Sequence, residues 1–141
     1  MARMIPPKIH PEVKSSAERR VFDWLRDAPG TEDWICLHSL GLSEHEAKRR
    51  AEIDFLDLTR FGVFVLEVKG GRVSRANGIW QFTNRFGTTD SKQEGPFDQA
   101  SGAMFGLEKR VREHFQNGSN RQQHLLYGFG VITPDCVLSD T

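Results

Sequence analysis

A pair of apolar runs in the middle of the chain constrains the fold more than any other feature. The first run extends from Glu52 to Leu58 and the second from Val63 to Gly71, with a short turn at residues 59–62 between them. The second run is rich in Val, Phe and Leu and has the length of a buried strand. The two runs therefore predict a β-hairpin within a larger sheet.

Charged side chains stand out near the end of this hairpin. Because side chains alternate across a strand, Glu67 and Lys69 emerge on the same face as Val65. In the other strand, Asp54 shares a face with Leu56. If the hairpin sets Asp54 beside Glu67, two carboxylates and an ammonium group converge. Carboxylates that lie close together in a partly dry site repel each other, so this arrangement needs compensation.

Two interpretations of the convergence follow from the residues alone. A divalent cation such as Mg²⁺ relieves the repulsion, since it prefers carboxylate and carbonyl oxygens together with water. Lys69 then holds an attacking water or offsets the charge on a phosphate. Alternatively, Lys69 forms an ordinary salt bridge with Glu67 or Asp54, because short charged triplets are common and weakly informative.

The order of several motifs resembles a known family. Asp54 followed by Glu67-Val68-Lys69 is similar to the D…(D/E)-x-K signature of the PD-(D/E)xK nuclease superfamily. Three segments of the sequence resemble the nuclease-related domain called NERD: AEIDFLDLTRFGVFVLEVKGG, GIWQF and GPFDQASGAMFGLEKRV. That family commonly has an E-I-D strand, a G-I-F-V-I-E-x-K strand, a strand with tryptophan and an N-P-x-x-Q helix start. The resemblance covers roughly residues 17 to 115.

This resemblance implies a metal-dependent nuclease that hydrolyses DNA. Asp54, Glu67 and the carbonyl of Val68 would bind one or two Mg²⁺ or Mn²⁺ ions, and Lys69 would orient the attacking water. A carboxylate on the first helix and a glutamine at the start of the long helix would complete the site, which assigns these roles to Glu18 and Gln99. The alternative function is a non-catalytic module that binds nucleic acid or a protein partner on the same scaffold. A ribonuclease, which would hydrolyse RNA instead of DNA, is a further alternative.

Glu18 and Gln99 have ordinary interpretations as well. Ser15 and Glu18 fit a capping box at the start of a helix that ends near Asp27, and Glu18 would then only satisfy backbone donors. One carboxylate can also serve both roles. Without the resemblance, Gln99 is an exposed polar residue in the first turn of a helix predicted at residues 97–115.

Basic residues near the expected site are candidates for nucleic-acid contact. The run Lys48-Arg49-Arg50 leads directly into the strand of Asp54, although such runs are usually solvated loops. Further candidates follow the hairpin: Arg72, Arg75 and Arg85. Trp80 and Phe82 alternate on one strand face, where packing in the core is more common than stacking on bases.

The remaining elements complete an α/β prediction. We expect strands at residues 33–40, 71–74, 79–82 and 125–132, a tight turn at Asn77-Gly78 and a polar, mobile loop at residues 83–95. His38 in the first of these strands is expected to be exposed or partly buried rather than a metal ligand. The predicted fold is a mixed central β-sheet flanked by helices, with the restriction-endonuclease-like core that the resemblance implies.

Length, charge balance and cysteine spacing limit the kinds of protein that this sequence can encode. The 141 residues fit one domain, with residues 1–14 as an extended arm and 15–141 as the nuclease-like domain. The 19 basic and 19 acidic residues balance, which gives no global field for nucleic acid. Cys36 and Cys136 lack metal-site spacing and are expected to be reduced thiols.

The sequence also gives expectations for the cellular location and the binding partners of the protein. With no signal peptide and no long apolar run, we expect a cytoplasmic protein without a membrane segment. We expect the chain to be one module of a larger protein, because the NERD domains that it resembles are often joined to helicase or kinase-like domains. DNA is the expected partner, and sheet edges or the N-terminal arm offer surfaces for a homo-oligomer.

Overall fold

A computed structural model describes residues 1–13, 15–41, 52–116 and 125–140. Its central sheet is mixed, because β2 and β3, and β3 and β4, pair antiparallel whereas β1 with β2 and β4 with β8 pair parallel. This sheet confirms the predicted fold class. The strands in spatial order are β1 (Arg3–Ile5), β2 (Ile35–Gly41), β3 (Glu52–Thr59), β4 (Gly62–Val68) and β8 (Tyr127–Ile132).

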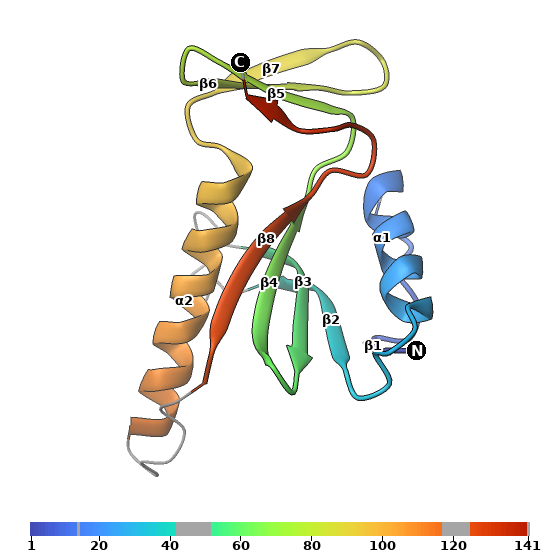
Figure 1. The fold of residues 1–141 in the computed structure, drawn as a ribbon, viewed down its shortest axis with the longest axis vertical. Coiled ribbons are helices and arrows are strands. Elements are labelled where there is room, and N and C mark those ends of the chain that lie inside the picture. The colour runs from blue at the N-terminus through green and yellow to red at the C-terminus, as the bar shows by residue number, and fades with distance from the viewer. Residues whose placement is uncertain (14, 42–51, 117–124, 141) are drawn as a thin grey trace.

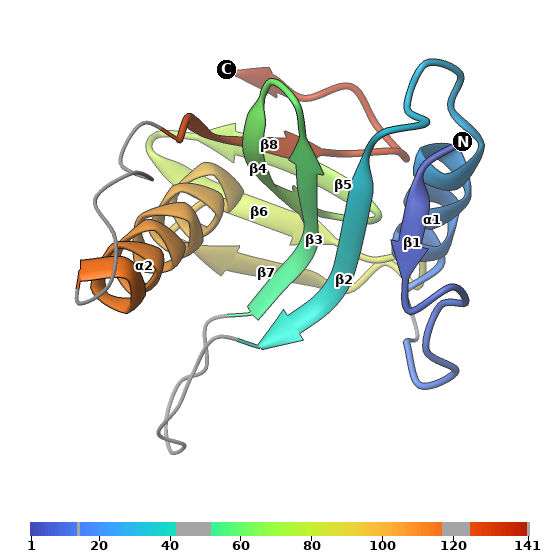
Figure 2. The same ribbon diagram turned by 90° about the horizontal axis from the view of Figure 1, so that it is seen from below.

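Two helices flank this sheet, α1 (Ser16–Asp27) and α2 (Pro96–Gln116) (Figures 1 and 2). Consecutive residues of β3 show that the helices cover opposite faces. Phe55 is buried in the core beneath α1, and Leu56 is buried in the core beneath α2. Strand alternation sends neighbouring side chains to opposite faces, so the sheet separates two hydrophobic cores.

The first helix begins as the capping signal predicts. Ser15 is the N-cap, and its side chain accepts a hydrogen bond from the backbone N–H of Glu18 at 3.1 Å. Ala17, Val21 and Phe22 are buried against the sheet. The prediction of a helix ending near Asp27 is confirmed.

The second helix begins at Pro96. Proline suits this position because the first N–H groups of a helix have no hydrogen-bond partner within the helix. Ala100, Ala103 and Met104 are buried, and they pack the first half of the helix onto the sheet. The expected helix at residues 97–115 is therefore confirmed, with one more residue at each end.

A second, smaller sheet lies beyond the ends of β4 and β8 (Figure 1). At the predicted turn, Asn77 and Gly78 have φ values of 53° and 78°, which joins two of its strands in a tight hairpin. The spatial order is β7 (Thr89–Lys92), β6 (Ile79–Thr83), β5 (Arg72–Ala76) and β9 (Ser139–Asp140).

The expectation of a polar loop throughout residues 83–95 is wrong, because this segment contains β7. All four residues of β7 are exposed, and the strand is held by its backbone pairing with β6. It has no apolar face, so hydrophobic alternation gives no sign of it.

Three residues of the N-terminal segment, Arg3–Ile5, form β1 and join the central sheet. Arg3–Ile5 pairs with Ile35–Leu37, and Ala2 and Met4 are buried in the core beneath α1. His38 is more buried than expected: it is 6% exposed, and its ring packs edge-on against Phe22. Neither helix has the length and apolar character needed to cross a bilayer, so the described residues contain no membrane-spanning helix.

Candidate active site

The hairpin of β3 and β4 brings Asp54 next to Glu67. Backbone pairing of the two strands extends to Phe55 and Leu66, and the next residues along this register are Asp54 and Glu67. Beyond that point the Asp54 side chain replaces regular pairing, because its Oδ2 accepts a hydrogen bond from the backbone N–H of Val68 at 2.9 Å. The Asp54 carboxylate is thereby tied to the end of β4.

Lys69 lies directly beside Glu67. The distance between Lys69 Nζ and Glu67 Oε2 is 3.2 Å, and the side chains are only 25% and 14% exposed. A partly buried ion pair of this kind is the arrangement that the salt-bridge interpretation predicts. It is equally the arrangement that places an ammonium group at the edge of a carboxylate site.

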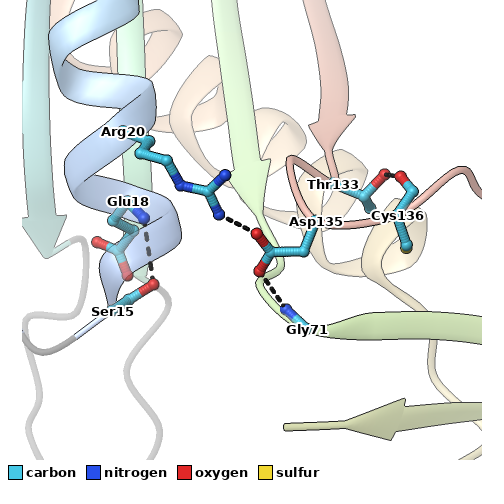
Figure 3. Close-up of polar contacts among 7 residues, drawn as sticks. All are labelled: Ser15, Glu18, Arg20, Gly71, Thr133, Asp135 and Cys136. Carbon is cyan, nitrogen blue, oxygen red and sulfur yellow. Dashed lines mark hydrogen bonds and ion pairs between the residues drawn. The ribbon is translucent and has the colours of Figure 1, made fainter. Parts of the chain in front are cut away.

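Glu18 joins the two strand acids from the first turn of α1. It lines a pocket of about 260 Å³ together with Asp54 and Glu52. Figure 3 shows Glu18 at the N-terminal end of α1, next to the Ser15 cap. The other lining residues come from the N-terminal segment and β2: His10, Glu12, Val13 and Ser39. We call Glu18, Asp54 and Glu67 the acidic cluster.

Burial raises the pKa of each member of the acidic cluster, and the charge of Asp54 adds to the shifts of Glu18 and Glu67. Burial raises the pKa of Glu67 to about 7, and the charge of Asp54 adds to the shift while Lys69 opposes it. Burial likewise raises the pKa of Glu18 to about 7, with contributions from Asp54, Glu52 and Glu67. Burial also raises the pKa of Asp54, although the bond from Val68 and the charge of Lys69 lower it. Added positive charge would therefore stabilise the ionised cluster.

Gln99 has an oxygen without a partner. Its Oε1 is buried and accepts no hydrogen bond from the described residues. The residue lies one turn before Ala103, which packs in the same core as Val65 of β4. Because α2 begins at the end of the sheet where β4 and β8 finish (Figure 1), Gln99 belongs to the same end as Glu67. A buried acceptor without a donor costs free energy, which a bound water or ligand would recover.

The residues fit a hard divalent cation by their donor chemistry. The acidic cluster supplies carboxylate oxygens whose mutual repulsion such an ion relieves, and Gln99 supplies a buried oxygen without a donor. Within residues 1–13, 15–41, 52–116 and 125–140, however, no three acidic, histidine or cysteine side chains already form a group that could hold a metal. Metal binding would therefore require the side chains to move closer together.

The chain matches the family described as NERD, the nuclease-related domain, over residues 14–133. The chain belongs to the NERD family. The matched region contains the acidic cluster, Lys69 and Gln99, and the family is placed in the PD-(D/E)xK superfamily. No match to this NERD domain was found among curated proteins or among solved structures.

Among the described residues of the NERD domain, the predicted basic residues Arg72, Arg75 and Arg85 do not form one patch. Lys48, Arg49 and Arg50 lie outside the described residues. Arg75 lies over the ring of Trp80, at 5.6 Å from the ring centroid, and Arg85 lies over Phe86 at 5.0 Å. Arg72 is exposed at the start of β5, and alternation along that strand directs it to the face opposite Arg75.

Sequence reasoning missed two groups around the site. Glu52 lines the pocket and adds negative charge near Glu18, and its position two residues before Asp54 on one strand is the signal that identifies it. Asp135 contacts Arg20 of α1 and accepts a hydrogen bond from the backbone N–H of Gly71 at 2.7 Å (Figure 3). No local pattern indicates this link, because Asp135 is 64 residues from Gly71.

Proposed function

We propose that this NERD domain is a metal-dependent nuclease that hydrolyses phosphodiester bonds in DNA. The observation that supports the proposal is the convergence of Glu18, Asp54 and Glu67, which come from α1, β3 and β4, beside Lys69. Buried carboxylates that destabilise one another are costly for a domain with only a structural role. They are typical of sites that receive a cation.

Asp54, Glu67 and the Val68 carbonyl would hold the metal. A bound Mg²⁺ or Mn²⁺ supplies a water of lowered pKa and stabilises the charge that develops on the phosphate. Asp54 must be ionised and correctly oriented for this role, and the hydrogen bond from Val68 supports both requirements. The same bond holds Asp54 close to Glu67 when the site is filled.

Lys69 would orient the attacking water and offset the charge on the scissile phosphate. Its ammonium group already lies 3.2 Å from Glu67 Oε2, so it can turn toward a substrate without leaving the site. Glu18 and Gln99 would hold water molecules around the reacting phosphate. An amide can donate and accept hydrogen bonds there without adding charge.

The ion pair between Lys69 and Glu67 also favours a second candidate function. In a non-catalytic module that binds nucleic acid, this pair would simply neutralise a partly buried acid at a strand end. Binding by such a module would be independent of metal and would weaken smoothly as salt increases. Binding by a nuclease site would instead change with the metal.

The test is cleavage of single-stranded, nicked and duplex DNA, and of RNA, in the presence of Mg²⁺, Mn²⁺ or a chelator. We expect metal-dependent cleavage of DNA that is lost in Asp54→Asn and Glu67→Gln. Glu113→Gln, on an exposed position of α2, is the matched control and should cut like the wild type. Equal cleavage by all variants would refute the assignment, and metal-independent binding without cleavage would favour the second function.

We extend the proposal to a partner activity. A NERD nuclease that acts on unwound DNA would work with a fused helicase or another ATPase domain. The 141 residues contain no G-x-x-x-x-G-K-[ST] loop for ATP. Cleavage of single-stranded DNA that exceeds cleavage of duplex DNA in the assay above would support this arrangement.

A further inference from the structure

A sharp turn after β4 carries the second sheet across the end of the central sheet where Lys69 lies. Gly71 has a φ of 75°, and a Cβ atom added there would collide with the carbonyl oxygen of Thr83. The backbone N–H of Gly71 donates to Asp135, which also pairs with Arg20 of α1 (Figure 3). The end of β6 is therefore held tightly against the residues that follow Lys69.

This packing brings the ring of Phe82 to Lys69. Phe82 is the residue before Thr83 on β6, and it pairs with Val73, which is 3% exposed. Paired residues of adjacent strands share a face, so the ring points inward with Val73. Lys69 Nζ lies 5.5 Å from the centroid of the Phe82 ring, within the range of a cation–π contact.

The ammonium group of Lys69 thus has two partners from different sheets. Glu67 Oε2 holds it from β4 at 3.2 Å, and the Phe82 ring holds it from β6 at 5.5 Å. A lysine side chain has many rotamers, and each partner reduces the number that are populated. Lys92 lies 6.0 Å from the same ring centroid, but it is on the exposed strand β7.

We propose that Phe82 is a positioning residue for Lys69: its ring holds the ammonium group at the acidic cluster in the orientation that the reaction requires. The effect on cleavage rests on the proposed nuclease function, whereas the contact itself does not. Phe82 acts through Lys69 and does not touch the substrate. Removing the ring should therefore lower kcat and leave KM almost unchanged.

The test compares three substitutions in the whole chain. Phe82→Leu keeps an apolar side chain but removes the ring, Phe82→Tyr keeps the ring, and Phe86→Leu is the control. Phe86 also lies beneath a cation, Arg85, but is 78% exposed. We expect kcat to fall about 2- to 10-fold in Phe82→Leu. The kcat should stay at the wild-type value in both Phe82→Tyr and Phe86→Leu.

A second readout does not depend on activity. An aromatic ring shifts the NMR signals of protons above it, so the ε-methylene protons of Lys69 should have an upfield shift in the wild type and in Phe82→Tyr. Phe82→Leu should lose this shift, and Phe86→Leu should keep it. Circular dichroism selects the folded variants, and Phe82→Met replaces Phe82→Leu if the latter is unfolded.

Several results would overturn the proposal. The first is an unshifted Lys69 signal in the wild type. The second is a rise in KM at constant kcat for Phe82→Leu, which would mean that the ring contacts substrate. The third is an equal loss of kcat in Phe86→Leu. An inactive wild type that retains the Lys69 shift would refute the nuclease function while establishing the contact, so the two failures are distinguishable.

Discussion

The carboxylate of Asp54 accepts a hydrogen bond from the backbone N–H of Val68, with 2.9 Å between Asp54 Oδ2 and the Val68 nitrogen. This contact joins β3 to the end of β4 one residue beyond Glu67. Asp54 therefore acts twice: it completes the backbone pairing of the hairpin, and its charge raises the pKa of Glu67. Substitutions at this position can separate the two roles.

Asp54→Asn should abolish metal-dependent cleavage without loss of stability. The amide oxygen can still accept the Val68 bond, and removal of the charge relieves the repulsion with Glu67. Asp54→Ala should also be inactive, but it leaves the Val68 donor without its partner and should be about 1 kcal/mol less stable. Urea denaturation and the DNA cleavage assay measure both effects. Equal stability of the two variants would contradict the role assigned to the bond.

Metal affinity should increase with pH. Burial and neighbouring charges raise the pKa of Glu67 to about 7, and a protonated carboxylate must lose its proton before it can bind a cation. We expect the affinity for Mn²⁺ to rise about tenfold between pH 6 and pH 8, as binding releases about one proton. Titration calorimetry at several pH values measures this change. An affinity that does not change with pH would show that Glu67 is not a ligand or is already ionised.

Asp57, an acid outside the acidic cluster, makes the stability of the fold depend on pH. Asp57 is 2% exposed and pairs with Cys36 across β2 and β3. Burial raises its pKa from 3.8 to about 6, so the folded protein holds this proton more tightly than the unfolded chain does. The stabilisation is fully present below about pH 4 and is lost as the pH rises to about 6.

Asp57→Asn removes this proton exchange. The stability of the wild type relative to Asp57→Asn should fall by about 1–3 kcal/mol between pH 4 and pH 7. Urea denaturation of both proteins at matched pH values measures the difference. A difference that stays constant over this range would mean that the pKa of Asp57 is not raised in the folded state.

Two glycine substitutions should have opposite effects on stability. Gly71→Ala places a Cβ atom against Thr83 at a φ of 75°, so it should cost at least 1–3 kcal/mol. Gly102→Ala falls within α2, where the added atom meets nothing within 4 Å, and it should stabilise the protein by up to about 1 kcal/mol. Thermal denaturation of both variants distinguishes them. Stabilisation by Gly71→Ala would contradict the tight turn.

The central part of the fold could be predicted because it depends on local patterns. Alternation along residues 52–58 and 63–69 is sufficient to place Asp54 and Glu67 at the same end of a hairpin. The Ser15 cap predicts the start of α1 in the same way, although it cannot say whether Glu18 only caps the helix or also joins the site. The position of Glu18 depends on how α1 packs, which no local pattern contains.

Other features could not be predicted, for physical reasons. β7 is polar on both faces, and its stability comes from backbone pairing with β6 rather than from burial. The contact between Phe82 and Lys69 requires the turn at Gly71, whose direction depends on tertiary packing. Asp135 acts over a long sequence separation, so its role appears only in the folded structure.

Asp135 also affects the order in which the site can be completed during synthesis. The acidic residues and Lys69 leave the ribosome long before Asp135, which joins α1 to the turn after β4. Until residue 135 is available, nothing from this late segment holds Gly71 or the strands that follow it. The nascent chain therefore carries its acidic residues and its lysine before it can hold them in their final arrangement.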